Sequence, residues 1–255
     1  MEIFPPDVVP ETVWRSLERW RGSVPLPAPG HGWASPEAAW GRLVGQICAI
    51  GSSRSWDALS APDIRERLAV QRIRGAGADA GVYVHQILAE IQVRYCSPRR
   101  ATSQKANAIA ANARSDFVAD ASGRVHLLDR LRQTVGEPDA RGVWSHTQAC
   151  EARRVLTDNL QFFGPKSASD FLLGLGLADS LLALDVRLLN LLVDFLGWDV
   201  RCRRLVQRLA DYERLEQQVV ATFCKPLDMR PVHLDRLLFY QYRVLRGEWA
   251  NLAGV

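Results

Sequence analysis

Apolar residues recur at spacings of three and four along most of the chain, as at Leu205, Leu209, Tyr212 and Leu215. This period is typical of helices that bury one face. Alternation at every second residue with β-branched side chains, which is typical of strands, is scarce. The sequence therefore predicts an all-α protein of about ten helices with short connections.

Local signals place these helices along the chain. A short helix around residues 11–20 is followed by a proline-rich connector, 24–36, which ends with Ser35 as an N-cap and Pro36 at the first helical position. The pattern then predicts helices over residues 37–50, 61–73, 82–95, 100–118, 125–135, 145–160, 167–177, 185–198, 201–223 and 233–245.

The bulk composition is that of a globular protein. The chain has 255 residues, of which 47% are hydrophobic and 24% charged, so it can bury a substantial core. A net charge of +4 is compatible with a nucleic-acid partner without requiring one. No uninterrupted apolar run reaches the length of about 18 residues needed to span a membrane, and no secretory signal opens the sequence. We expect a cytoplasmic protein without a membrane partner.

The cysteines and glycines predict neither a metal nor a cofactor. The five cysteines are far apart, and no CxxC motif occurs, which favours free thiols in a reducing compartment. His146 and Cys150 could share a helix face, but a tetrahedral site needs two further ligands. The "GAGADAG" stretch, 75–81, lacks the spacing and the preceding strand of a dinucleotide site, and it is interpreted as a loop.

Lys166 is unusual in a chain that has only three lysines among its 32 basic residues. It follows the Gly164-Pro165 pair at the head of an apolar helix. The stretches "CEARRVLTDNL", "QFFGP" and "KSASDFLLGLGL" predict a helix–hairpin–helix, whose turn aims backbone N–H groups at a DNA phosphate. Arginine would serve a phosphate contact at least as well, whereas only lysine can lose its proton and form a Schiff base.

Other polar residues have two open interpretations. Asp185 is favoured as an N-cap, and at the end of a long apolar run it could also oppose positive charge on a sugar. Arg99 and Arg100 lie near a predicted helix start, either as a solvated basic face or as phosphate contacts.

The hairpin, the Gly-Pro turn, the lysine, the apolar helix and an aspartate nineteen residues after the lysine resemble the helix–hairpin–helix, Gly/Pro, Asp superfamily of base-excision DNA glycosylases. The stretch "GPKSASDFLLGLGLADSLLALDVRLL" is most similar to the bifunctional 8-oxoguanine DNA glycosylase/lyases, including branches without an iron–sulfur cluster. Two weaker likenesses are "CSPRRATSQKANAIAANAR" and "HLDRLLFYQY". The chain departs from the family at Phe162, where the hairpin usually has glycine, and at Arg187, where histidine is usual.

This resemblance implies a two-lobed fold. Residues 37–180 would form a helical barrel that ends in the hairpin, and residues 1–36 with 181–255 would form the second lobe. The cleft between them would receive a base flipped out of double-stranded DNA, and the protein would act as a monomer, associated with the nucleoid in a bacterium.

The resemblance also implies roles for individual residues. Lys166 would be the nucleophile, and Asp185 would stabilise the cationic sugar. Phe163 and Gly164 of the turn, with Arg99 and Arg100, would contact DNA. Asp235 and Phe239, spaced i,i+4, would contact the flipped base, with Gln46 as a further amide contact.

Three functions remain open from the sequence. The first is excision of an oxidised purine, 8-oxoguanine above all, with cleavage of the abasic site through a lysine Schiff base. The second is the same chemistry on an oxidised pyrimidine or another modified base. The third is a catalytically silent DNA-binding module, which would need the hairpin but not the pairing of Lys166 with Asp185.

Overall fold

The computed structural model describes residues 9–50, 55–198 and 208–250 and is all-α over these ranges. An isolated bridge between Ala119 and Val125 is the single β-type pairing among the described residues. The predicted fold class is therefore confirmed. The helices are α1 (Glu11–Trp20), α2 (Pro36–Ala49), α3 (Trp56–Leu59), α4 (Pro62–Arg67), α5 (Val70–Gly75), α6 (Ala80–Glu90), α7 (Gln104–Arg114), α8 (Leu127–Val135), α9 (His146–Asn159), α10 (Pro165–Gly174), α11 (Val186–Leu196), α12 (Leu209–Val219), α13 (Pro231–Tyr240) and α14 (Tyr242–Ala250).

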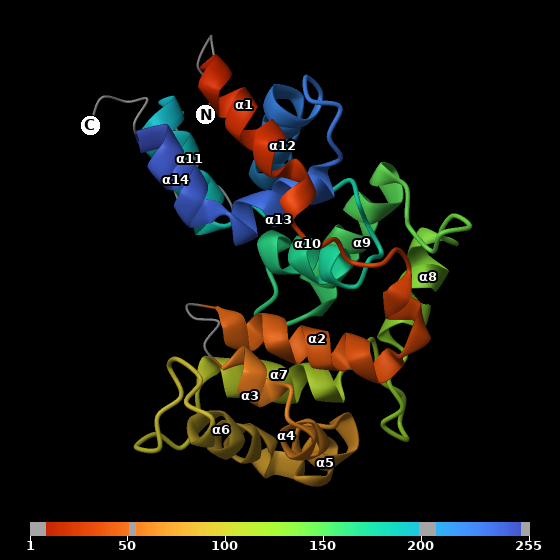
Figure 1. Ribbon diagram of the computed structural model, residues 1–255. Helices are drawn as coiled ribbons and strands as arrows, with labels where there is room; N and C mark the ends of the chain where they lie inside the picture. The colour runs from red at the N-terminus through yellow and green to blue at the C-terminus, as the bar shows by residue number, and fades with distance from the viewer. Residues whose placement is uncertain (1–8, 51–54, 199–207, 251–255) are drawn as a thin grey trace.

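The helices form two lobes (Figure 1). The larger core cluster runs from Ala39 to Leu181 and includes Val232. The smaller cluster contains Val13 and Leu17 of α1 together with residues from Leu182 to Trp249. The N-terminal helix therefore packs with the C-terminal helices, and we propose that the lobe limits predicted from the sequence follow this division.

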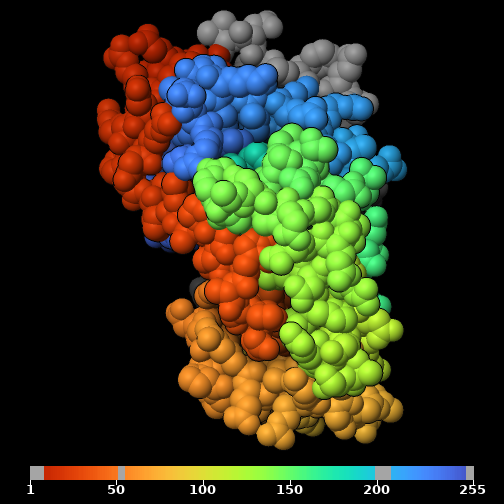
Figure 2. Space-filling view, turned by 90° about the vertical axis from the view of Figure 1, so that its right-hand side faces the viewer, coloured from red at the N-terminus to blue at the C-terminus, as the bar shows by residue number. Residues whose placement is uncertain are grey.

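A second view shows the same arrangement from another side (Figure 2). Residues of α1 and of the C-terminal helices gather at one end, and the segment around α4 and α5 lies at the other end. Helices α9 and α10 lie between these ends and pack against each other, and α10 also packs against α2. The hairpin that joins α9 to α10 is thus part of the larger lobe and lies close to the smaller one.

Several predicted helices are shorter or interrupted. The helix predicted over 61–73 breaks into α4 and α5 at Leu68, whose carbonyl oxygen accepts the Trp40 indole N–H at 2.8 Å. The helix predicted over 82–95 ends at Glu90, because Gln92 is left-handed (φ 56°) and the Val93 N–H turns back to the Leu88 carbonyl at 2.8 Å.

Two C-terminal predictions also differ from the structure. The stretch 233–245 divides at Gln241 into α13 and α14. Of the helix predicted over 201–223, residues 201–207 lie outside the described residues; α12 begins at Leu209 and continues into the π-helical turn Val220–Cys224.

The proline-rich connector fixes the far end of α10. The N–H of Gly30 donates to the Gly176 carbonyl at 2.7 Å, and the N–H of Gly32 donates to the Leu175 carbonyl at 2.9 Å. Gly176 is left-handed (φ 65°), and a Cβ there would collide with the Ala28 carbonyl oxygen, so only glycine fits. The segment that leaves α10 toward α11 therefore starts from a fixed point.

Candidate active site

Helices α9 and α10 form the predicted helix–hairpin–helix. The first helix begins with a capping box, in which the Ser145 hydroxyl accepts from the Gln148 N–H and the Gln148 side chain accepts from the Ser145 N–H. The second helix begins at Pro165, and Gly164 precedes it without any side-chain cap. Its first N–H groups are therefore available to an anion, because proline at the first position removes only a donor that the helix does not use.

The turn has a left-handed residue at position 162, although this residue is phenylalanine and not glycine. Phe162 has a φ of 60° and is 40% exposed. The turn is held by Asn112 of α7, whose side-chain oxygen accepts from the Gln161 N–H at 2.8 Å and whose amide donates to the Gln161 carbonyl at 3.1 Å. The substitution of phenylalanine for glycine thus leaves the backbone reversal intact.

The next two residues of the turn differ in exposure. The Phe163 side chain is buried and makes an edge contact with Phe171, with ring centroids 5.8 Å apart. The N–H groups of Phe163, Gly164 and Lys166 donate to no acceptor among the described residues. Phe163 can therefore contact DNA only through its backbone, whereas Gly164 is open to solvent, with no atom near the position of a Cβ.

Lys166 lies on the first turn of α10 and makes an ion pair on its own helix. Its Nζ donates to Asp170 Oδ2 at 3.2 Å, and its side chain is 38% exposed. Asp170 also forms ion pairs with two arginines. The NH2 atom of Arg42 on α2 is 3.1 Å from Oδ1, and the NH2 atom of Arg236 on α13 is 3.8 Å from the same oxygen. Burial acts to raise the pKa of Asp170, but these three cations outweigh it and hold the pKa below its usual range.

Asp185 caps α11 as predicted. Its Oδ1 accepts from the N–H groups of Arg187 at 2.9 Å and Leu188 at 3.0 Å. Its Oδ2 accepts no hydrogen bond from the described residues. One oxygen therefore serves the helix, and the other is available within the pocket that Asp185 lines.

The segment before Asp185 is held by three side chains of the smaller lobe. The Leu182 N–H donates to Glu216 at 2.7 Å, the Ala183 N–H to Asp235 at 2.8 Å, and the Leu184 N–H to the Tyr212 hydroxyl at 3.0 Å. Three consecutive amides are thus fixed from α12 and α13. This clamp sets the position of Asp185 with respect to α10.

The side chain of Asp235 is 8% exposed. Burial raises its pKa to about 7; the charge of Arg236 opposes this rise, and that of Asp170 adds to it. On the next turn of α13, Phe239 is 45% exposed, and the Arg187 guanidinium lies 4.6 Å from the centroid of its ring. A buried acid and an accessible aromatic ring thus share one face of the helix.

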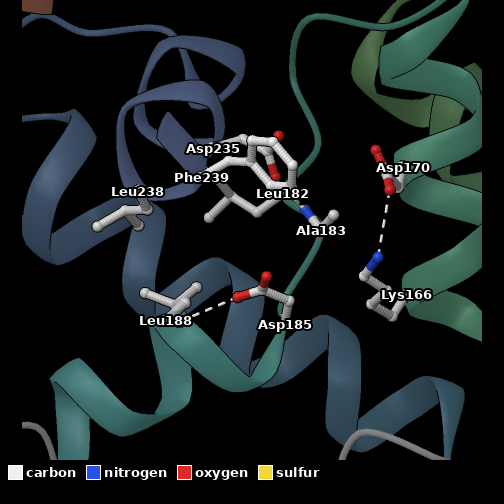
Figure 3. Close-up of a pocket in the computed structure, with 9 residues that line it drawn as sticks. All are labelled: Lys166, Asp170, Leu182, Ala183, Asp185, Leu188, Asp235, Leu238 and Phe239. Atoms are coloured by element: carbon white, nitrogen blue, oxygen red, sulfur yellow. Dashed lines mark hydrogen bonds and ion pairs between the residues drawn. The ribbon is translucent and has the colours of Figure 1, made fainter. Parts of the chain in front are cut away.

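Four of the predicted residues meet in one pocket between the lobes (Figure 3). Lys166 and Asp170 lie on the α10 side, whereas Asp235 and Phe239 approach from α13, and Asp185 lies at the start of α11. The free volume is about 20 Å³, which is room for about one water molecule. A nucleobase can therefore enter only if a lining side chain moves. The full lining is Lys166, Asp170, Leu182, Ala183, Asp185, Leu188, Asp235, Leu238 and Phe239.

The other predicted site residues lie outside this lining. Gln46 is buried on α2, one turn beyond Arg42. Arg99 and Arg100 are exposed in the loop before α7, beside a shallow groove that includes His85. Their predicted contacts with DNA stay predictions. Among the described residues, no group of three histidine, cysteine, aspartate or glutamate side chains could hold a metal ion.

The cations around Asp170 were missed from the sequence. Asp170 itself could have been noticed, because it stands four residues after Lys166 and so shares its helix face. Arg42 and Arg236 come from distant parts of the chain, and nothing in their local sequence distinguishes them from the 27 other arginines.

The two lobes, the hairpin and the pocket between the lobes form a fold that the chain shares with two solved proteins. The chain is similar to the 8-oxoguanine DNA glycosylase of Thermotoga maritima, with a TM-score of 0.59 and 18% identity over 90% of this chain and 95% of that one. It is also similar to the 8-oxoguanine DNA glycosylase of Methanocaldococcus jannaschii, with a TM-score of 0.57 and 14% identity over 91% of this chain and 94% of that one. No protein-family model matches the chain, and no curated protein matches its sequence. At these identities the likeness establishes the fold.

Proposed function

We propose that the chain is a DNA glycosylase with abasic-site lyase activity, which removes an oxidised purine, 8-oxoguanine above all, from double-stranded DNA. The observation that carries this proposal is the meeting of Lys166 and Asp185 in one pocket between the lobes. The two solved structures of similar fold are both described as 8-oxoguanine DNA glycosylases, which supports the choice of substrate. No helix among the described residues is long and apolar enough to cross a membrane.

The proposed chemistry starts at the sugar of the flipped nucleotide. The Lys166 amine attacks C1′ and forms a carbon–nitrogen bond while the bond from C1′ to the base breaks. The base leaves with the bonding electron pair and accepts the proton that the attacking nitrogen gives up. The Asp185 carboxylate stabilises the positive charge that develops on the sugar.

The lyase step follows from the same adduct. The bond from C1′ to O4′ then breaks, O4′ keeps the electron pair and takes a proton from solvent, and a protonated Schiff base forms between Lys166 and C1′. Loss of a C2′ proton then expels the 3′ phosphate and cuts the strand, and water releases the lysine. A module that only binds DNA needs neither Lys166 nor Asp185 in this pocket.

The pocket walls favour a guanine-type edge. Asp235 in its ionised form is an acceptor only, and the Watson–Crick edge of 8-oxoguanine presents N–H donors. Phe239 supplies an aromatic face for stacking. We propose that these residues read the flipped base, that the hairpin amides with Arg99 and Arg100 bind phosphates, and that the protein acts as a monomer.

The test is a set of duplexes that each carry one lesion: 8-oxoguanine, an oxidised pyrimidine, an alkylated purine, or no damage. Base release and strand cleavage are measured separately, with and without alkali. We expect release and cleavage on 8-oxoguanine. Cleavage of the duplex with the oxidised pyrimidine alone would show that the same chemistry acts on another base. Binding without base release or cleavage on any duplex would show that the protein is a catalytically silent DNA-binding module.

Lys166→Gln should abolish both steps and leave DNA binding largely unchanged. The matched control is Lys225→Gln, which changes an exposed lysine outside the pocket and should retain activity. Borohydride added during turnover should trap the wild type and the control covalently on lesion DNA. Full trapping of Lys166→Gln would show that another amine is the nucleophile.

A further inference from the structure

Arg153 is fully buried in the middle of α9, the first helix of the hairpin. Its NH1 atom donates to Glu216 Oε2 at 2.7 Å, and its NH2 atom donates to Glu213 Oε1 at 3.0 Å. Both glutamates lie on α12, in the smaller lobe. The guanidinium also lies over the ring of Tyr212 from the same helix, 5.1 Å from its centroid. A buried charge on the hairpin is therefore neutralised by acids of the other lobe.

Glu216 connects this arginine to the segment before Asp185. Its Oε2 accepts from Arg153, and its Oε1 accepts from the Leu182 N–H at 2.7 Å. The Glu216 side chain is 2% exposed, so water does not compete for either oxygen. Arg153 thus holds the carboxylate that binds the first of the three clamped amides.

Ser169 joins the same network to α10, the helix that carries Lys166. Its hydroxyl oxygen accepts from Arg153 NH1 at 3.3 Å and lies 3.2 Å from the Tyr212 hydroxyl. The Arg153 guanidinium therefore contacts α10 and α12 at once. Figure 3 shows that Lys166 reaches the pocket from α10 and Asp185 from the start of α11, so the network links the two sides of the pocket.

A buried ion pair of this kind is better suited to fixing a position than to raising stability. Apolar side chains of similar size often give as much stability, because desolvation of the charges offsets their attraction. Apolar side chains also pack over a range of positions. A planar guanidinium that is bonded to two carboxylates has fixed donor directions, and so it favours one relative position of the helices that it joins.

We propose that Arg153 is a positioning residue, which ties the hairpin to the segment before Asp185 through Glu216. It thereby sets the position of Asp185 relative to Lys166. The proposal rests on the roles proposed for these two residues in base release. Arg153 itself is fully buried and does not line the pocket, so its loss should slow the chemical step without weakening DNA binding.

The main test removes both charges of the pair. Arg153→Met alone leaves Glu216 as an unpaired buried charge, so a slower reaction could follow from a damaged fold. Arg153→Met/Glu216→Gln removes that charge and keeps an amide oxygen for the Leu182 N–H. We expect the double variant to recover most of the wild-type thermal stability, whereas single-turnover base release on saturating lesion DNA falls about tenfold to a hundredfold. Release at the wild-type rate would overturn the proposal.

Arg153→Lys keeps the charge and tests the same point if the double variant does not fold. An ammonium can bond Glu216, but it cannot span both glutamates and Ser169 as the planar guanidinium does. Base release should fall about threefold to tenfold at unchanged DNA affinity, and a wild-type rate would count against the proposal. The matched control is Arg230→Met, which removes an exposed ion pair to Asp179 between the lobes and should keep the wild-type rate.

Amide hydrogen exchange tests the positioning without DNA. The amides of residues 182–184 should exchange about tenfold faster in both Arg153 variants, because a lost hydrogen bond in the network eases local opening. They should be unchanged in Arg230→Met. A wild type that neither releases a base nor is trapped by borohydride on abasic DNA would refute the proposed function. Unchanged exchange in the Arg153 variants would refute the positioning role, whatever the activity.

Discussion

The Arg187 guanidinium lies over the Phe239 ring, 4.6 Å from its centroid, and so covers an aromatic residue that lines the pocket. Cation–π contacts at such exposed positions are weak, about 0.5–1 kcal/mol. A base that enters the pocket can therefore displace the guanidinium at small cost and use the same ring for stacking.

Phe239→Ala should weaken the handling of lesion DNA. Stacking of one base on an aromatic side chain is worth about 1–3 kcal/mol, which corresponds to a loss of roughly fivefold to a hundredfold in kcat/KM. Tyr95→Ala is the control, because Tyr95 is an exposed aromatic residue that does not line the pocket. Equal losses in the two variants would show that Phe239 is not a stacking platform.

Asp185→Asn should slow base release by about two to three powers of ten, because asparagine cannot stabilise a cationic sugar as a carboxylate does. Asparagine is also a good N-cap, so the thermal stability should change little. Single-turnover release on saturating DNA measures the effect, and Asp194→Asn, on the exposed face of the same helix, is the control. A loss of stability that accounts for the loss of activity would speak against an electrostatic role.

The sequence was most informative where the signal is local. Gly164-Pro165 before an apolar run predicts the start of α10, and an aspartate before the next apolar run predicts the cap of α11. The i,i+4 spacing of Asp235 and Phe239 correctly placed them on one face. These features depend on neighbours within a few residues, so they could be inferred without the fold.

Contacts between helices could not be inferred in this way. Arg42 and Asp170 are 128 residues apart, and their pairing depends on how α2 crosses α10. The break of a predicted helix at Leu68 depends likewise on the indole of Trp40, 28 residues away. The apolar periodicity of a helix indicates which face is buried. It does not indicate which polar side chain of another helix packs against that face.

The raised pKa of Asp235, about 7, predicts a dependence of stability on pH. The unfolded chain releases this proton near pH 4, so the folded state binds more protons between about pH 4 and 7, and stability falls as pH rises through that window. Asp235→Asn should remove a decline of about 4 kcal/mol across this window, measured by chemical denaturation. Asp129→Asn, which changes an exposed acid on α8, should keep the wild-type slope.

The left-handed Phe162 predicts a gain in stability on substitution by glycine. The left-handed conformation destabilises a residue with a Cβ by about 1–2 kcal/mol. Glycine removes this strain but loses more backbone entropy on folding, which offsets about half of the gain. Phe162→Gly should therefore raise the free energy of unfolding by about 0.5–1 kcal/mol. Phe162→Ala keeps the strained backbone and should give no gain, so a gain with alanine would trace the effect to the aromatic ring instead.

The amides of residues 182–184 are held by side chains of α12 and α13. We expect that loss of one of these hydrogen bonds slows base release without weakening DNA binding. Tyr212→Phe removes the acceptor of the Leu184 N–H and the donor to the Leu182 carbonyl, which leaves two buried groups unpaired. Asp185 follows directly, so its position relative to Lys166 should become less defined, and base release on saturating DNA should fall about tenfold to a hundredfold.

The matched control for this clamp is Tyr83→Phe in the other lobe. It also removes a hydroxyl that donates to a backbone carbonyl, that of Arg67 at 2.9 Å, but one that is remote from the pocket. Both variants should lose stability, whereas only Tyr212→Phe should lose single-turnover rate at unchanged affinity for lesion DNA. Parallel losses of rate would mean that activity follows global stability, and a Tyr212→Phe enzyme of full rate would show that Asp185 is held by its own helix alone.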